Sequence, residues 1–163
     1  MALLPPIKDL EHLSDEWDKD CDIDYDRIDL ELLKIPSLHS KYYRIRNHHR
    51  KVSLALTEKY RVMKELRREW IEGKSELETL QEQEWEQYQG NPITTRTAQE
   101  ARLATDPVLS KILMKKEIQD EIVNICDGYI RQLKDRNYEL RGVTEHRKFF
   151  QEYNPIGTFS NKK

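Results

Sequence analysis

The sequence from Leu38 to Trp70 reads LHSKYYRIRNHHRKVSLALTEKYRVMKELRREW. A 4-3 spacing in this stretch selects Leu38, Tyr42, Ile45, His49, Val52, Leu56, Lys59, Met63, Leu66 and Trp70. All of these except His49 and Lys59 are apolar or aromatic. A period of 3.5 residues kept over several heptads predicts one long helix packed in a left-handed bundle or coiled coil. We expect it at 37–72, with Pro36 near its first turn and Gly73 at its end.

A second long helix is expected on the C-terminal side of the chain. Its start is marked by Thr105 or Asp106 as cap and Pro107 in the first turn. Its apolar positions are Ile112, Ile118, Ile122, Ile125, Tyr129, Leu133 and Leu140. A bend near Gly142 should precede a further helix. A connection with a Gly-Asn-Pro break joins the two long helices, so we expect them to run antiparallel. The expected fold is all-α, a long antiparallel helical hairpin with short flanking helices.

Charge divides the chain into blocks that its net charge of −2 conceals. Residues 1–33 hold 3 basic and 11 acidic side chains, residues 34–74 hold 12 and 4, and residues 75–90 hold five glutamates and no Lys or Arg. We expect an acidic N-terminal arm at 1–33, a helical domain at 34–153 and a disordered tail at 154–163. The helical domain would contain the basic helix 37–72, an acidic connector at 75–106 and C-terminal helices at 107–153. The arm would be flexible or docked, and would either contact basic partners or cover a basic site.

Catalytic motifs are missing from this sequence. It has no Gly-rich phosphate loop, no GxSxG and no HExxH. His48 and His49 are adjacent, so on a helix their side chains point about 100° apart and do not serve one metal. The aspartates after Asp20 follow part of an EF-hand pattern, but Tyr25 stands where the loop needs glycine. We expect neither an enzyme nor a metal nor another cofactor, and no small-molecule substrate.

Nothing in the chain indicates a membrane or an oxidising compartment. No apolar run approaches the ~20 residues of a membrane helix, and the N-terminus lacks the features of a signal peptide. Cys21 and Cys126 lie outside any CxxC motif, which is typical of reduced thiols. A cytoplasmic protein is expected.

The basic block suggests a surface for a polyanion. Its cations are Lys41, Arg44, Arg46, Arg50, Lys51, Lys59, Arg61, Lys64, Arg67, Arg68 and Lys74. At 100° per residue Lys64, Arg67 and Arg68 share a face, and tyrosines and Trp70 are interleaved with the cations. Phosphates are bound by long cationic side chains, and unpaired bases stack on aromatic rings. A solvated helix face with internal ion pairs explains the same residues, and Trp70 also fits the apolar seam.

Three stretches resemble the UvsY-type recombination mediator proteins of tailed phages. They are DIDYDRIDLELLKIPSLHSKYY (residues 22–43), MKELRREWIEGK (63–74) and LKDRNYELRGVTEHRKFF (133–150). The likeness runs from about Asp22 to Gln151. In this family a Lys/Arg cluster that precedes an aromatic pair and a glycine contacts DNA. Here that pattern falls on Lys64, Arg67 and Arg68, with Trp70 following and Ile71 replacing the second aromatic.

The resemblance implies a non-enzymatic protein that binds single-stranded DNA and loads a RecA-like recombinase onto strand covered by single-strand-binding protein. This would serve phage homologous recombination, repair and recombination-dependent replication. The expected DNA contacts are Lys59, Arg61, Lys64, Arg67, Arg68, Trp70 and Lys74. A ring-like homo-oligomer is also implied, with contacts expected at Leu56, Met63, Leu66, Ile122, Tyr129, Leu133, Phe149 and Phe150. The alternative is a structural or adaptor coiled-coil protein that binds only protein partners.

Overall fold

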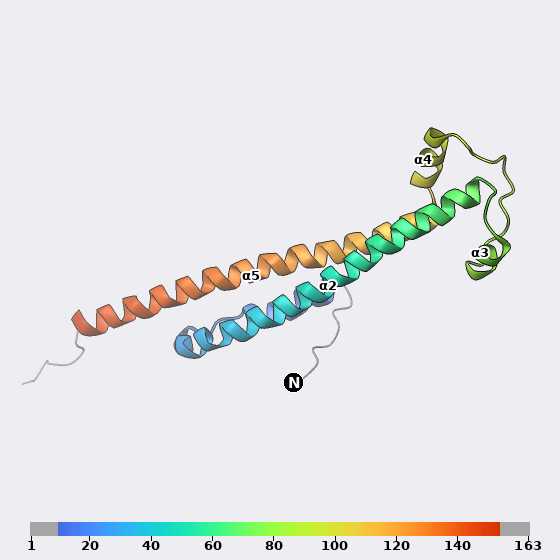
Figure 1. The fold of residues 1–163 in the computed structure, drawn as a ribbon. Coiled ribbons are helices and arrows are strands. Elements are labelled where there is room, and N and C mark those ends of the chain that lie inside the picture. Colours follow the sequence, from blue (N-terminus) through green and yellow to red (C-terminus); the bar gives the residue numbers. More distant parts are fainter. Residues whose placement is uncertain (1–9, 154–163) are drawn as a thin grey trace, which may run out of the picture. The chain divides into compact units, whose positions relative to one another are not determined.

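The computed structural model describes residues 10–153, and all regular structure in that range is helical (Figure 1). The elements are α1 (Leu10–Cys21), a short 3-10 helix (Tyr25–Arg27), α2 (Ile28–Ile71), α3 (Leu77–Glu82), α4 (Arg96–Ala104) and α5 (Pro107–Tyr153). The expected all-α class is confirmed. The disordered tail expected at 154–163 lies outside the described residues.

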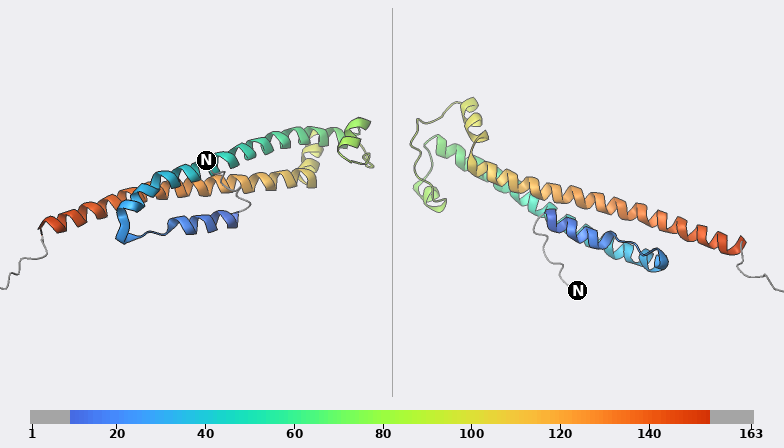
Figure 2. Two further views of the ribbon diagram at one scale, coloured as in Figure 1. Left: turned by 90° about the horizontal axis from the view of Figure 1, so that it is seen from below. Right: turned by 180° about the vertical axis from the view of Figure 1, so that it is seen from behind.

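The chain forms two compact units, and both long helices contribute to each. Unit 1 contains the described residues up to Asn47 and those from Ile122 onward, and unit 2 is His48–Glu121. Within each unit a segment of α2 lies antiparallel beside a segment of α5 (Figures 1 and 2). In the described part of the chain, no helix is both long enough and apolar enough to cross a bilayer.

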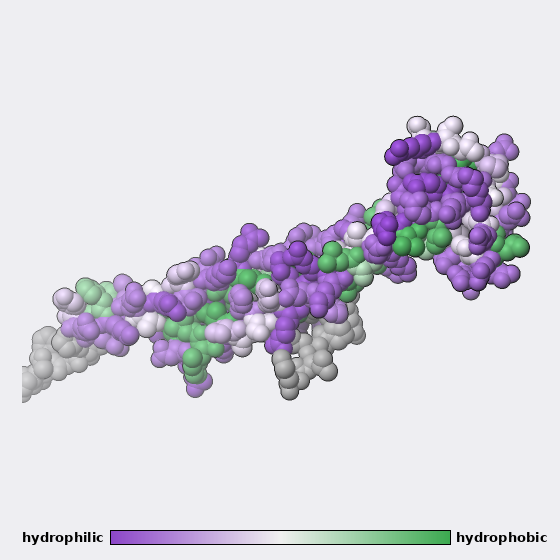
Figure 3. Space-filling model, in the orientation of Figure 1, coloured by the Kyte–Doolittle hydropathy of each residue, from purple (hydrophilic) through white to green (hydrophobic). Residues whose placement is uncertain are grey.

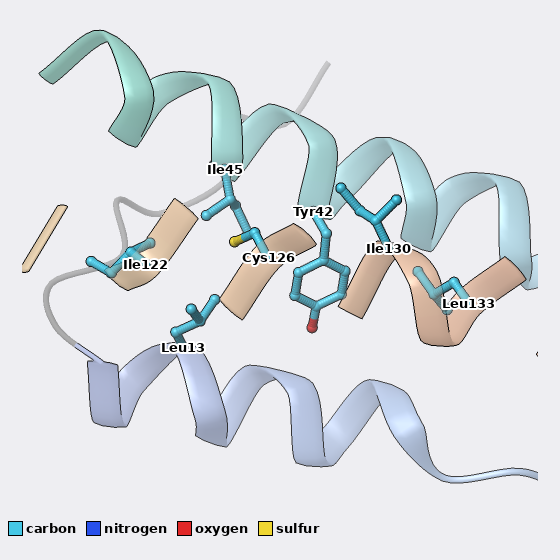
Figure 4. Close-up of a cluster of buried hydrophobic side chains, with 7 residues drawn as sticks. All are labelled: Leu13, Tyr42, Ile45, Ile122, Cys126, Ile130 and Leu133. Carbon is cyan, nitrogen blue, oxygen red and sulfur yellow. The ribbon is translucent and has the colours of Figure 1, made fainter. Parts of the chain in front are cut away.

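Unit 1 has its main core where α1, α2 and α5 meet (Figure 4). The buried members are Leu13, Tyr42, Ile45, Ile122, Cys126, Ile130 and Leu133. Ile122 and Leu133 are both 0 % exposed. Both residues were expected between subunits, and here the apolar side of α1 covers them within the same chain.

Helix α1 is attached through its aromatic and charged side chains. Trp17 stacks on Tyr129 at a centroid distance of 4.1 Å and meets Tyr42 edge-on. The Lys41 ammonium binds Glu16 at 2.9 Å and Asp20 at 2.7 Å. Within the acidic N-terminal segment, this helix is therefore docked, and it neutralises Lys41, a lysine of the basic block. Tyr129, another expected oligomer contact, is half-buried against α1.

Helix α2 begins at Ile28, nine residues before the expected start, and Pro36 lies inside it. A proline in a helix interior costs about 3 kcal/mol through a lost hydrogen bond and a steric clash. Burial favours the longer helix: Ile28 and Ile35 form a second core cluster with Leu140, and Leu32 packs against it. Tertiary packing has therefore overridden the local signal for a helix start at Pro36. The helix expected after Gly142 is likewise continuous with α5.

Unit 2 is organised around the C-terminal end of α2. Ile71, Leu103 and Leu109 form its buried cluster, with Tyr60, Met63, Trp70 and Tyr88 packed against them. Gly73 ends α2 in a left-handed conformation, with φ of +71°. Its amide donates to the Trp70 carbonyl and the Lys74 amide donates to the Glu69 carbonyl, the two hydrogen bonds of a Schellman motif.

The apolar seam of α2 is broken at its two polar positions in different ways. His49 is buried, with Nδ1 2.7 Å from Oε1 of Gln119, whereas Lys59 is exposed. Leu56, Met63 and Leu66 are half-buried. Figure 3 shows a largely hydrophilic surface with scattered hydrophobic patches. Of the residues expected to join subunits, Phe149 and Phe150 are exposed, at 54 % and 49 %.

Candidate nucleic-acid interface

The cations expected to contact DNA belong to α2 and the turn after it, and all lie in unit 2. They differ in exposure and in the partners that their charges have. Lys59, Arg61 and Lys74 are exposed, Lys64 and Arg68 are half-buried, and Arg67 is buried. The sequence placed these side chains on one helix, but their partners come from segments that the helical pattern does not reveal.

Arg67 is part of the core of unit 2. Its guanidinium binds Asp106 at 2.6 Å, and the two side chains are 7 % and 4 % exposed. The same guanidinium lies over the rings of Trp70 and Trp85, at 3.9 and 4.7 Å from their centroids. Asp106 also caps α5, because its Oδ1 accepts the amides of Val108 and Leu109. Arg67 therefore holds the start of α5 against the end of α2.

Trp70 packs internally as well. Its Nε1 donates to the carbonyl of Glu86 at 2.8 Å, and its ring meets Tyr88 edge-on at 4.9 Å. These contacts fix the connector after α3 onto α2. Arg67 and Trp70, both expected to contact DNA, are therefore engaged in contacts within unit 2.

Lys64 and Arg68 share one acidic partner on α4. The Lys64 ammonium binds Oε2 of Glu100 at 2.7 Å, and Arg68 binds Oε1 of the same carboxylate at 3.1 Å. Arg68 also binds Glu65, one turn earlier on its own helix. The hydrogen bond from Lys64 holds the pKa of Glu100 below its usual range, so this carboxylate is ionised at neutral pH.

Among the residues that the structure describes, the exposed cations pair only with carboxylates close to them in the sequence, or with none. Arg61 pairs with Glu58 at 2.6 Å, and Lys74 pairs with Glu72 at 2.7 Å. The Arg61 and Lys74 side chains are 71 % and 70 % exposed. Across residues 10–153, Lys59 forms no ion pair with a carboxylate. These three side chains extend into solvent, where a phosphate is able to reach them.

Sequence reasoning did not identify the acidic partners of these cations, and it selected Asp106 only as a helix cap. Glu100 and Asp106 lie in the segment 91–110, whose charges sum to zero, so the block pattern gave no reason to select them. The effect of each carboxylate depends on the cation that it pairs with, and tertiary packing decides that pairing. Within the described range, no group of three or more His, Cys, Asp or Glu side chains is arranged to hold a metal ion.

The surface can thus bind phosphates through cations that are exposed or weakly paired, on a helix whose end is fixed by a buried ion pair. A family model described as "Recombination, repair and ssDNA binding protein UvsY" matches residues 16–152. The chain belongs to the UvsY family. No curated protein is significantly similar to it in sequence.

Crystal structures of the bacteriophage T4 recombination mediator protein UvsY resemble this chain in fold. One, from lattice type IV, has a TM-score of 0.73 at 19 % identity and covers 86 % of this chain and 98 % of the T4 chain. Those from lattice types II and I both have a TM-score of 0.70, at 18 % and 17 % identity. They cover 86 % and 84 % of this chain and 96 % and 97 % of the T4 chain. At such identities the likeness shows a shared UvsY fold.

Proposed function

We propose that this protein is a recombination mediator that binds single-stranded DNA. It loads a RecA-like recombinase onto strand that is covered by single-strand-binding protein, in phage homologous recombination, repair and recombination-dependent replication. The observation that carries the proposal is the family match over residues 16–152. The T4 relative, whose fold this chain shares, is itself described as a recombination mediator protein.

The strand-binding surface is formed by Lys59, Arg61, Lys64, Arg68 and Lys74. Lys59, Arg61 and Lys74 support this assignment because they are exposed, so a phosphate binds them without breaking a buried contact. Binding through phosphates is insensitive to base sequence and weakens with salt. Each phosphate neutralised on a single strand contributes about −0.7 to the slope of log K against log salt. Lys64 and Arg68 converge on one anionic group, so the five cations would neutralise four phosphates and give a slope of about −2.8 per chain.

A titration of fluorescently labelled oligo(dT) at low and high salt tests this proposal. Lys64→Ala/Arg68→Ala should weaken binding and make the salt slope shallower by about 0.7, because the one phosphate that these two cations share is lost. Lys134→Ala/Arg141→Ala is the matched control, since it removes two exposed cations of α5 outside the proposed surface. Equal losses in the two variants would refute the assignment of the surface.

Self-association into a ring-like homo-oligomer completes the proposed mechanism. The exposed aromatic residues Phe149, Phe150 and Tyr153 at the end of α5 support it: Phe149 lies 4.5 Å from Tyr153 and 6.1 Å from Phe150 between ring centroids. Exposed aromatic groups of this kind are typical of protein interfaces. A ring places several weak strand sites close together, so one strand engages several subunits at a high effective concentration.

Sedimentation of the wild-type chain and of Phe149→Ala/Phe150→Ala measures the mass in solution. The variant should have the lower mass, and an unchanged oligomer would exclude this contact. Recombinase loading is tested separately, by the rate at which a RecA-like ATPase starts on strand covered by single-strand-binding protein. The competing function, an adaptor that binds only protein, requires that no strand binds even at low salt.

A further inference from the structure

Lys64 and Arg68 hold one carboxylate between them. Both cations lie on α2 four residues apart, which places them on one face of the helix. Each takes a different oxygen of Glu100, at 2.7 and 3.1 Å. Two cations that converge on both oxygens of a single anionic group form an anion-binding site, and here a side chain of the same chain fills it.

The group that fills the site has the chemistry of a backbone phosphate. A carboxylate and a phosphodiester each carry one negative charge shared by two unesterified oxygens on one central atom. A lysine and an arginine that hold the two carboxylate oxygens can hold those of a phosphate in the same way. The other acidic partners near the surface differ from Glu100, because Glu58 and Glu65 each pair with only one of its cations.

We propose that Lys64 and Arg68 form the binding site for a single phosphate of the strand, and that Glu100 occupies this site in the free subunit. Strand binding then exchanges the glutamate carboxylate for a phosphate. This inference rests on the proposed function, and it adds that α4 sets the affinity of the strand-binding surface by competing with the strand.

Helix α4 does not depend on Glu100 for its position. Leu103 is 2 % exposed within the core cluster of unit 2. Gln99 donates to Glu72 at 2.6 Å and to the carbonyl of Ile93 at 2.8 Å. The Glu100 side chain is 44 % exposed and can rotate away while α4 stays in place. Competition therefore weakens strand binding without abolishing it, since exposed ion pairs are individually weak.

Glu100→Gln tests the exchange, because it removes the competing charge and keeps the size of the side chain. Its matched control is Glu117→Gln on α5, an exposed glutamate of the same unit whose loss changes the net charge equally. Binding of labelled oligo(dT) is measured by fluorescence anisotropy over a range of salt concentrations. We expect Glu100→Gln to raise the affinity about three- to tenfold at low salt, clearly more than the control. Its salt slope should be steeper by about 0.7, for one further positive charge at the strand.

Combining the substitutions locates the effect. In a Lys64→Ala/Arg68→Ala background, Glu100→Gln should give no gain beyond that of Glu117→Gln, because the site itself is absent. A gain that persists there, a loss of affinity, or equal effects of the two glutamine variants would each overturn the exchange. Those results leave the proposed function standing if the wild-type chain binds the strand. If the wild-type and all variants fail to bind at low salt, both the function and the inference are refuted. Thermal unfolding of each variant confirms that the proteins compared are folded.

Discussion

Replacing Arg67 by alanine should destabilise unit 2 far more than any other removal of a cation from the α2 surface. The Arg67 and Asp106 side chains are 7 % and 4 % exposed, so the substitution leaves a buried carboxylate without its partner. Removing one member of a buried ion pair typically costs 3–5 kcal/mol, about 3 kcal/mol here because Asp106 keeps two amide donors. The lost contact with the Trp70 ring, 3.9 Å from the guanidinium, adds about 1 kcal/mol.

The free energy of unfolding should therefore fall by about 4 kcal/mol, which lowers Tm by about 10 °C for a chain of this size. Denaturant unfolding followed by tryptophan fluorescence measures it, because Trp70 and Trp85 both lie beside Arg67. Arg61→Ala is the control: its exposed side chain should leave the free energy of unfolding nearly unchanged. A loss below about 1 kcal/mol for Arg67→Ala would refute the argument that this ion pair holds α5 against α2.

Three further results are expected. Glu16→Gln should reduce stability at neutral pH but not near pH 2, because the hydrogen bond from Lys41 lowers the Glu16 pKa to about 2 in the folded protein. The stability that the Glu16 carboxylate contributes is present above its ordinary pKa of 4.5 and is lost as the pH falls towards 2. A difference in Tm between the two proteins that does not change with pH would contradict this. In a Cys21→Ser variant, Cys126 should resist a disulfide reagent at pH 8 until the protein unfolds, since burial raises the pKa of its thiol to about 12; rapid labelling of the native protein would disprove this. Gly73→Ala should lower the free energy of unfolding by about 1 kcal/mol, because alanine is strained at a φ of +71°. A clash adds nothing to this cost, since the new Cβ would meet only Pro92, at an ordinary 3.7 Å. Denaturant unfolding measures the change, and an unaltered midpoint would argue against backbone strain.

Local patterns predicted the helices well where period and end signals agreed. The seam after Leu38 indicated α2, and the Asp-Pro pair indicated the start of α5, which the structure places at Pro107 with Asp106 as its cap. The prediction of the start of α2 was wrong because Pro36 is a local signal for the first turn of a helix, whereas here it lies inside one. A proline penalty of about 3 kcal/mol is offset by the burial of Ile28 and Ile35 against Leu140, a contact over more than a hundred residues of chain.

Apolar periodicity also could not distinguish contacts within the chain from contacts between subunits. Ile122 and Leu133 lie on a stripe that needs a cover, and the pattern does not say which helix supplies it. Here α1 supplies it, from a segment that was expected as an acidic arm, either flexible or docked. Helix α1 has few apolar residues, but Leu13 and Trp17 share one side of it, and this is enough to bury Leu13 and to cover part of Trp17.

The sequence by itself determined that this protein is a pair of long helices with a basic stretch, because helical period, caps and charge blocks are local properties. Its likeness to the UvsY family was also visible in the order of three motifs. Only the tertiary structure decided what each cation does. Arg67, Arg68 and Lys64 look equivalent on one helix face, yet Asp106 makes the first a core residue and Glu100 pairs with the other two. The reason is that the free energy of a charge depends on its burial and on the partners that folding places beside it.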